Sequence, residues 1–513
     1  MTVNGKGIAA ARAEESAEPV RPAAGPIERE SLPVFQAIVT IGVFQALAMG
    51  FQLVRSKVVA VALGPSGVGA ISLVDHVAAL AAQISTFSLP FAAVKFLSAA
   101  HSQNHGSFAN LFAALARALL LVSIAGTIVT VGLLLGWPGL LGPDLSSYAG
   151  VAVLAVLAIP ATNVFSLVTN AMAAARRVRA SAIYGAWNGA ALAVSCAVGA
   201  LLAGLRGYYL GNLAAMVAVV AGGLFYLNRR EGLSVTREGV SLLPELRRHP
   251  NVVGFAASLY VISFALPVAH LIARYAVLES QGLAAAGLLQ SAMALGLALA
   301  TVMRQSNALL LVPAMNRARP GEEKLLHAGD YLRVISVVMA VVAMPLVLFP
   351  EWWLPLLYSR EFLAAAPYTY LFVLAQTIQM FAGVNLALLV GLDHIGAQVW
   401  ITLCGLGALA VLAWSLVPHF GIAGVAIAML LNGTVVFVLS AGHLWAAHRF
   451  AVHRAVDLLP FAMTLLIAVA GAVAARLPST TGIIVGKCLA CSIVATVGLR
   501  ILRRRDRPLL WSP

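Results

Sequence analysis

The chain has 513 residues, of which 61% are hydrophobic and 10% are charged, with a formal net charge of +14. A water-soluble globular protein needs more charged surface than this, so the composition predicts a chain that crosses the bilayer many times. The positive charge does not indicate nucleic acid, because its distribution along the chain fits membrane topology. All four cysteines lie in apolar runs, and no disulfide framework is expected.

Residues 1–33 are hydrophilic and lack the apolar run of a signal peptide, which predicts a flexible cytoplasmic tail. After them, apolar stretches of about 20 residues predict an all-α polytopic membrane protein with about fourteen transmembrane helices. The predicted units are a six-helix bundle at 34–228, a cytoplasmic linker at 229–251, a second six-helix bundle at 252–446, and two further helices with a basic tail at 447–513.

Two internal matches predict that the two bundles are repeats. Gly67 to Asp75 resembles Gly282 to Gln290, 215 residues later, and the residues after Gly207 resemble those after Gly421, 214 residues later. Because six is an even number, both bundles enter the membrane from the same side. We therefore expect parallel repeats related by a pseudo-twofold axis along the membrane normal, with a cavity between them.

The basic residues predict the orientation. With the N-terminus inside, most of the 33 Lys and Arg residues fall in the tail, the linker, the other cytoplasmic loops and the C-terminus. The positive-inside rule then places both termini in the cytoplasm and the turn at Gly64-Pro65-Ser66-Gly67 outside.

Charged and polar residues within the spans are the candidate site, because a charge near the centre of a membrane helix costs about 2.5 to 3.5 kcal/mol. At 100° per residue they form stripes on several helices. The stripes are Gln45, Gln52 and Arg55 on the first helix, Ser263, His270 and Arg274 on the seventh, and Gln290 and Arg304 on the eighth, with Arg117 two turns into the third. The candidate site contains four arginines but one clear acid, Asp75, so its net charge is positive. Arginine suits phosphate because its fork binds two oxygens at once.

Other interpretations of these residues stay open. Lys57, Lys95, Arg274 and Lys487 lie near span ends, where long cationic side chains reach the headgroups, and Arg117 could reach the cytoplasmic side. Asp75 and Arg55 flank the turn at similar depth, so Asp75 is either a structural partner of Arg55 or an ion-coupling acid. His270 is either a hydrogen-bonded core histidine or a proton carrier.

Signatures of enzymes and metal sites are missing from the sequence. It contains no GxxxxGK[ST] loop, no HExxH and no paired CxxC motifs, so we expect no cofactor, no metal and no catalysis.

Four segments carry a resemblance to a known family. They are SKVVAVALGPSGVGAISLVD with AAVKFLSAAHSQ at 56–103, ALPVAHLIARYAVL at 265–278, GLLQSA with LLVPAMNRA at 287–318, and LYSREFLAAAP at 357–367. With them the chain resembles the Wzx-type O-antigen flippases of the multidrug/oligosaccharidyl-lipid/polysaccharide exporter superfamily. That resemblance implies two six-helix bundles in a V, alternating access, and membrane-embedded arginines and lysines that hold a diphosphate. Arg55 stands where related lipid II flippases carry an arginine, but Ala70 stands about where they have an acid.

The sequence therefore predicts a flippase that moves undecaprenyl-diphosphate-linked oligosaccharide across the bacterial inner membrane for a surface polysaccharide such as O-antigen, exopolysaccharide or capsule. Arginines would bind the diphosphate or sugar acids, and the three glutamines would bind sugar hydroxyls. Expected partners are the lipid-linked oligosaccharide, membrane lipids, a polysaccharide polymerase and chain-length proteins, with no nucleic acid. The alternatives are a cation-coupled multidrug exporter of the same superfamily, a sugar or drug facilitator, and a polytopic glycosyltransferase or polymerase.

Overall fold

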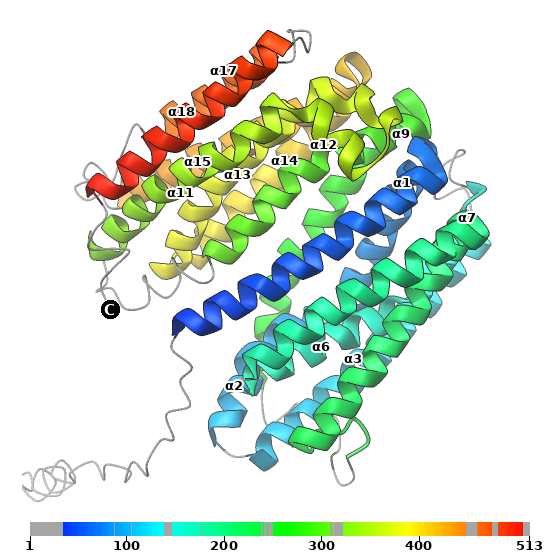
Figure 1. Ribbon diagram of the computed structural model, residues 1–513. Coiled ribbons are helices and arrows are strands. Elements are labelled where there is room, and N and C mark those ends of the chain that lie inside the picture. The colour runs from blue at the N-terminus through cyan, green and yellow to red at the C-terminus, as the bar shows by residue number, and fades with distance from the viewer. Residues whose placement is uncertain are drawn as a thin grey trace, which may run out of the picture.

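The computed structural model describes residues 34–86, 88–103, 105–137, 146–175, 177–237, 250–307, 322–447, 459–474 and 481–505, with Val240, Pro244 and Leu311. In this part of the chain the secondary structure is helical and contains no strand, so the predicted all-α class is confirmed. The helices lie side by side in two groups, with α17 and α18 at the outer edge of the second (Figure 1). The predicted tail at 1–33 lies outside the described residues.

The first group consists of α1 (Val34–Thr86), α2 (Leu89–Gln103), α3 (His105–Gly136), α5 (Ala149–Leu157), α6 (Ile159–Ala174) and α7 (Val178–Glu231). The second consists of α9 (Pro250–Ser306), α11 (Glu322–Leu348), α12 (Pro350–Leu357), η3 (Arg360–Ala365), α13 (Ala366–Gly391), α14 (Ile395–Phe420) and α15 (Ile422–Ala447). Two more helices follow it, α17 (Leu459–Ala474) and α18 (Thr481–Arg505).

Nine helical stretches in the described part of the chain are long and apolar enough to cross a membrane. Three of them belong to α1, α7 and α9, which have 53, 54 and 57 residues. A straight helix of that length would measure about 80 Å, whereas the hydrocarbon core is about 30 Å thick. Each of the three contains non-helical residues at an internal turn, and the count of about fourteen spans stays a prediction.

Contacts across α7 show that it folds back on itself. Gly199 packs against Gly207, and Gly211 packs against Ser195, so residues equally far from Ala203, in the turn Ala203-Gly204, face each other. Such close approach of two backbones requires glycine, because a Cβ atom would overlap the opposite carbonyl group.

Glycines in the left-handed region make these turns. Gly64 in α1, Gly204 in α7 and Gly282 in α9 have φ values of 63°, 59° and 80°, and Gly421, between α14 and α15, has 56°. Only glycine enters this region without steric cost. Gly204 lies near Leu63, and Gly421 packs against Gln281, so the turns gather at one end of the molecule, which we call the hairpin end.

The turns also define the repeat. Gly64 and Gly282 are 218 residues apart, and Gly204 and Gly421 are 217 apart. The duplicated arrangement that the sequence predicts is present, but its register differs by three residues from the sequence matches. Apolar helices resemble one another at many offsets, whereas a left-handed glycine marks one defined position in each unit.

The two groups touch at the hairpin end around an approximate twofold axis. Gly69 packs on the carbonyl of Leu283, and Gly287 packs on the carbonyl of Pro65. Each residue of the first contact has its equivalent 218 positions later or earlier in the second. The first turns of the two hairpins are therefore in backbone contact, and the hairpin end is closed.

The segment formed by α12 and η3 adds to this closure. Lys57 of α1 donates a hydrogen bond to the carbonyl of Pro355, at the carboxyl end of α12, and Glu361 lies beside Gly64. Tyr358 and Phe362 are buried in one apolar cluster with residues of α1 and α7. The hairpin end thus combines side chains from both groups in a common core.

Candidate functional site

The polar stripes predicted on the first and seventh helices occupy equivalent positions. At an offset of 218, Gln45 corresponds to Ser263 and Gln52 corresponds to His270. Gln52 is exposed, and the other three side chains are half-buried. The repeat places polar groups at matching depths in both groups, a relation that the offset of 215 had hidden.

Arg55 is the accessible cation of this region. Its side chain is half-buried beside the buried thiol of Cys196, and Tyr208 and Asp75 lie within electrostatic range. Within the described residues, no carboxylate lies at ion-pair distance from its guanidinium. Its positive charge is therefore available to an anionic ligand.

Asp75 is held by a tyrosine. Tyr209, whose side chain is 1% exposed, donates a hydrogen bond of 2.8 Å to Oδ1 of Asp75. The direct ion pair between Asp75 and Arg55, one of the two interpretations drawn from the sequence, is not formed. Asp75 itself is exposed, although Leu73 and Val74 just before it are buried. The carboxylate is thus fixed through one oxygen, while the side chain as a whole remains exposed.

Arg274 and Gln290, both predicted to bind substrate, are engaged in the contact between the two groups. Arg274 is 2% exposed, and its Nε donates to Ser72 Oγ at 3.0 Å while Nη2 donates to Gln290 Oε1 at 2.8 Å. Ser72 Oγ also donates to Gln290 Oε1, at 3.2 Å. Ser72 and Gln290 are equivalent at the offset of 218, so this cluster lies close to the twofold axis. In this conformation Arg274 is buried and hydrogen-bonded, and Oε1 of the half-buried Gln290 accepts two hydrogen bonds within the protein.

Two histidines border that cluster. His270 is half-buried and lies within electrostatic range of Arg274. His76, which the sequence reasoning missed, has its Nδ1 at 2.7 Å from the carbonyl oxygen of Ser72, one helical turn earlier. The signal for His76 was its place directly after Asp75, on the helix that carries the acid.

The side chain of Arg117 is hydrogen-bonded to backbone carbonyls. Its Nε donates to the carbonyl of Val235 at 2.7 Å, Nη2 donates to the carbonyl of Arg237 at 2.6 Å, and Nη1 donates to the carbonyl of Val240. All three carbonyls belong to the linker after α7. Arg117 therefore anchors the linker to α3 in this conformation, and its predicted role in substrate binding stays a prediction. Arg304 lies in α9, and its side chain is outside the described residues.

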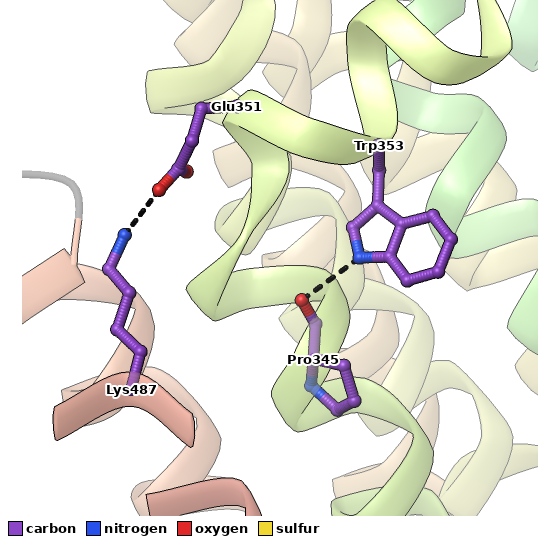
Figure 2. Close-up of polar contacts among 4 residues, drawn as sticks. All are labelled: Pro345, Glu351, Trp353 and Lys487. Atoms are coloured by element: carbon purple, nitrogen blue, oxygen red, sulfur yellow. Dashed lines mark hydrogen bonds and ion pairs between the residues drawn. The ribbon is translucent and has the colours of Figure 1, made fainter. Parts of the chain in front are cut away.

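A buried ion pair connects the last helix to the hairpin end (Figure 2). Lys487 of α18, with 6% of its side chain exposed, donates to Glu351 of α12 at 2.6 Å. Trp353 of the same short helix donates to the carbonyl of Pro345 at 3.1 Å. Its place near a span end had suggested that Lys487 reaches the lipid headgroups. Instead, Lys487 is paired with Glu351 within the protein.

The fold is similar to that of solved transporters. The lipid II flippase MurJ in an inward closed conformation gives a TM-score of 0.67 at 10% identity, over 92% of this chain and 99% of MurJ. An inward-facing multidrug resistance transporter of the MATE family, in the MOP superfamily, gives 0.59 at 15% identity, over 81% of this chain and 99% of the other. An outward-facing MATE transporter gives 0.54 at 14% identity, over 82% and 96%.

No protein-family model matches the chain, and no curated protein sequence matches it either. Because the identities to the solved structures are low, the likeness shows the fold alone. The chain has the all-helical fold of the MOP-type transporters. In the described ranges, no three His, Cys, Asp or Glu side chains gather as a metal site would need.

Proposed function

We propose that the protein is a flippase that moves an undecaprenyl-diphosphate-linked oligosaccharide from the cytoplasmic to the periplasmic leaflet of the bacterial inner membrane. The oligosaccharide would serve surface polysaccharide assembly, together with a polymerase and chain-length proteins. The observation that carries the proposal is Arg55, an accessible guanidinium without a carboxylate partner in the described residues, inside the fold of MOP-type transporters. A diphosphate is the group that such a cation binds best in an apolar setting.

The predicted orientation indicates which side of the membrane the closed hairpin end faces. With both termini in the cytoplasm, as the basic residues predict, the hairpin end faces the periplasm. The contact of Gly69 and Gly287 then closes the periplasmic side, and the site around Arg55 is reached from the cytoplasmic side. This is the state in which a substrate made in the cytoplasm would enter.

The remaining residues divide into three roles. Arg55 and Arg304 bind the diphosphate or sugar acids, and Gln45 and Gln52 bind sugar hydroxyls. Asp75, held by Tyr209, is the candidate for coupling to an ion gradient, and His270 is the second. Arg274 and Gln290 hold the two groups together while the hairpin end is closed.

The test is the binding of undecaprenyl diphosphate to the purified protein. A hydrogen bond to a charged group contributes about 1.5 to 3 kcal/mol, so Arg55→Ala should weaken binding roughly 10- to 150-fold. Arg55→Lys should give an intermediate loss, because lysine binds phosphate as a point charge. Arg206→Ala, at an exposed arginine of the hairpin end, is the matched control and should bind as the wild type does. Equal binding by Arg55→Ala and wild type would remove Arg55 from the mechanism.

A second candidate function is the export of cationic drugs. The observation that favours it is Asp75, an exposed carboxylate without an ion-pair partner in the described residues. A cationic dye such as rhodamine 6G separates the two functions. An exporter would bind the dye and lose it in Asp75→Asn, while Arg55→Ala would leave dye binding intact or strengthen it.

A further inference from the structure

A pocket of about 240 Å³ lies between the last turns of α7 and the segment that follows. Its lining combines the apolar side chains Leu224, Phe225 and Leu233 with the polar side chains Asn228, Ser234 and Thr236. The pocket is therefore amphipathic, and it lies at the end of a membrane span that finishes at Glu231.

The polar side is shaped by a tight turn. Gly232 has a φ of 60° and ends α7, and Leu233, 1% exposed, fixes the chain that follows. The hydroxyls of Ser234 and Thr236 share a hydrogen bond of 3.1 Å, and the backbone N–H of Thr236 donates to Ser234 Oγ at 3.2 Å. Because that bond uses one of the two hydroxyl protons, the other hydroxyl is left to donate to an oxygen of an anionic group.

The surroundings of the pocket are positively charged. Arg229 and Arg230 follow the lining residue Asn228 directly and are exposed, and Arg237 follows the lining residue Thr236. Arg117 donates three hydrogen bonds to backbone carbonyls of this segment, and within the described residues no carboxylate pairs with it.

Glu231, the acid among the described residues of this segment, does not cancel this charge because it is paired with Arg177 at 2.8 Å. Within the described residues, an anion at the polar lining of the pocket would thus meet an excess of cations. An apolar chain attached to the anion could lie along Phe225, 63% exposed at the end of the span.

We propose that this pocket binds the phosphate headgroup of an anionic phospholipid, with an acyl chain along α7. The predicted orientation places the pocket at the cytoplasmic leaflet, whose surface is negatively charged. Because Arg117 ties the same segment to α3, a bound lipid would fix the start of the linker between the two groups. The site is independent of the candidate substrate site around Arg55, so its test does not depend on the proposed flippase activity.

The experiment measures lipid binding to the purified full chain in a neutral detergent, by native mass spectrometry and by thermal stability. Short-chain phosphatidylglycerol, short-chain phosphatidylcholine and inorganic phosphate are titrated separately. We expect phosphatidylglycerol to bind at least tenfold more tightly than phosphatidylcholine, and inorganic phosphate to give no comparable stabilisation. Raising the salt concentration should weaken the binding of phosphatidylglycerol.

Two sets of variants test the residues. Ser234→Ala with Thr236→Ala, and separately Arg229→Gln with Arg230→Gln, should each reduce the affinity for phosphatidylglycerol roughly tenfold. The matched control is Arg206→Gln with Arg360→Gln. It removes two exposed arginines at the hairpin end, the end of the molecule opposite the pocket. The proposal is overturned if phosphatidylcholine binds equally well, if inorganic phosphate alone reproduces the effect, or if the control loses as much affinity as the other variants. Arg229 and Arg230 are exposed, so their variants should fold. These variants test the proposal even if the hydroxyl variants fail to fold.

Discussion

Replacing Gly69 and Gly287 by alanine should open the hairpin end. A Cβ at Gly69 would lie within 3.0 Å of the carbonyl oxygen of Leu283, and a Cβ at Gly287 would lie within 3.0 Å of that of Pro65. Close carbon–oxygen contacts between helices are normally about 3.3 to 3.6 Å, so the helices must separate. Overpacking of this kind costs about 1 to 3 kcal/mol. Only conformations in which the hairpin ends touch carry that cost, so the population of the closed state should fall roughly 5- to 150-fold.

The assay is a distance measurement by pulsed electron resonance. Spin labels at Ser66 and Glu279, both exposed and on opposite sides of the contact, report the separation of the two groups after the other exposed cysteines are removed. Either alanine should shift the distribution toward longer distances and lower the flipping rate. The controls are Gly132→Ala and Gly442→Ala, where a Cβ meets no atom within 4 Å. They gain the same helix propensity without the overlap. Unchanged distances in the Gly69 and Gly287 variants would refute the view that this backbone contact forms the closure.

Three further outcomes are expected. Lys487→Met removes the ion pair between Lys487 and Glu351. Loss of one partner of a fully buried pair costs about 3 to 5 kcal/mol, and because Glu351 is 23% exposed we expect a smaller loss and a correspondingly smaller fall in melting temperature. The exchange of Lys487→Glu with Glu351→Lys should restore the melting temperature. In Arg117→Lys the three nitrogens of the guanidinium, each bound to a different carbonyl, are replaced by one ammonium nitrogen that cannot reach all three. Amide exchange at 233–237 should therefore accelerate while the helices stay protected, and unchanged exchange would contradict the anchor. Asp75→Asn keeps an acceptor for Tyr209 but removes the charge, so ion-driven transport should fail while substrate binding persists; transport at the wild-type rate would exclude Asp75 as the coupling group.

The architecture was predictable because it depends on local patterns. Apolar runs of membrane length and the Gly64 turn identify the first hairpin, and the same logic applies at Gly282. The register of the repeat was not predictable from residue similarity, because apolar helices match at several offsets. The left-handed glycines settle it, and the 218-residue spacing then also relates Gln52 to His270.

The candidate site was less predictable, because the partners of a buried cation are often backbone groups far along the chain. Arg117 looked like a cavity residue on helical spacing alone, and nothing in the sequence shows that carbonyls more than 100 residues away fill its hydrogen bonds. The partners of Arg274 were hidden for a related reason, since Ser72 and Gln290 reach it only through the twofold contact. Arg55 stays a candidate because the structure gives it no such partner in the described residues.

The symmetric frame carries an asymmetric distribution of charge. At the 218-residue offset, Arg55 corresponds to Ala273 and Asp75 corresponds to Met293, and both counterparts are buried and apolar. Of these equivalent pairs, the accessible charges therefore belong to the first group, while Arg274 of the second is buried and hydrogen-bonded. A diphosphate bound by Arg55 alone would leave the second group free to move. A diphosphate that also contacts Arg304 of α9 would tie the two groups together, so the closed arrangement could separate only after one of the two arginines releases it.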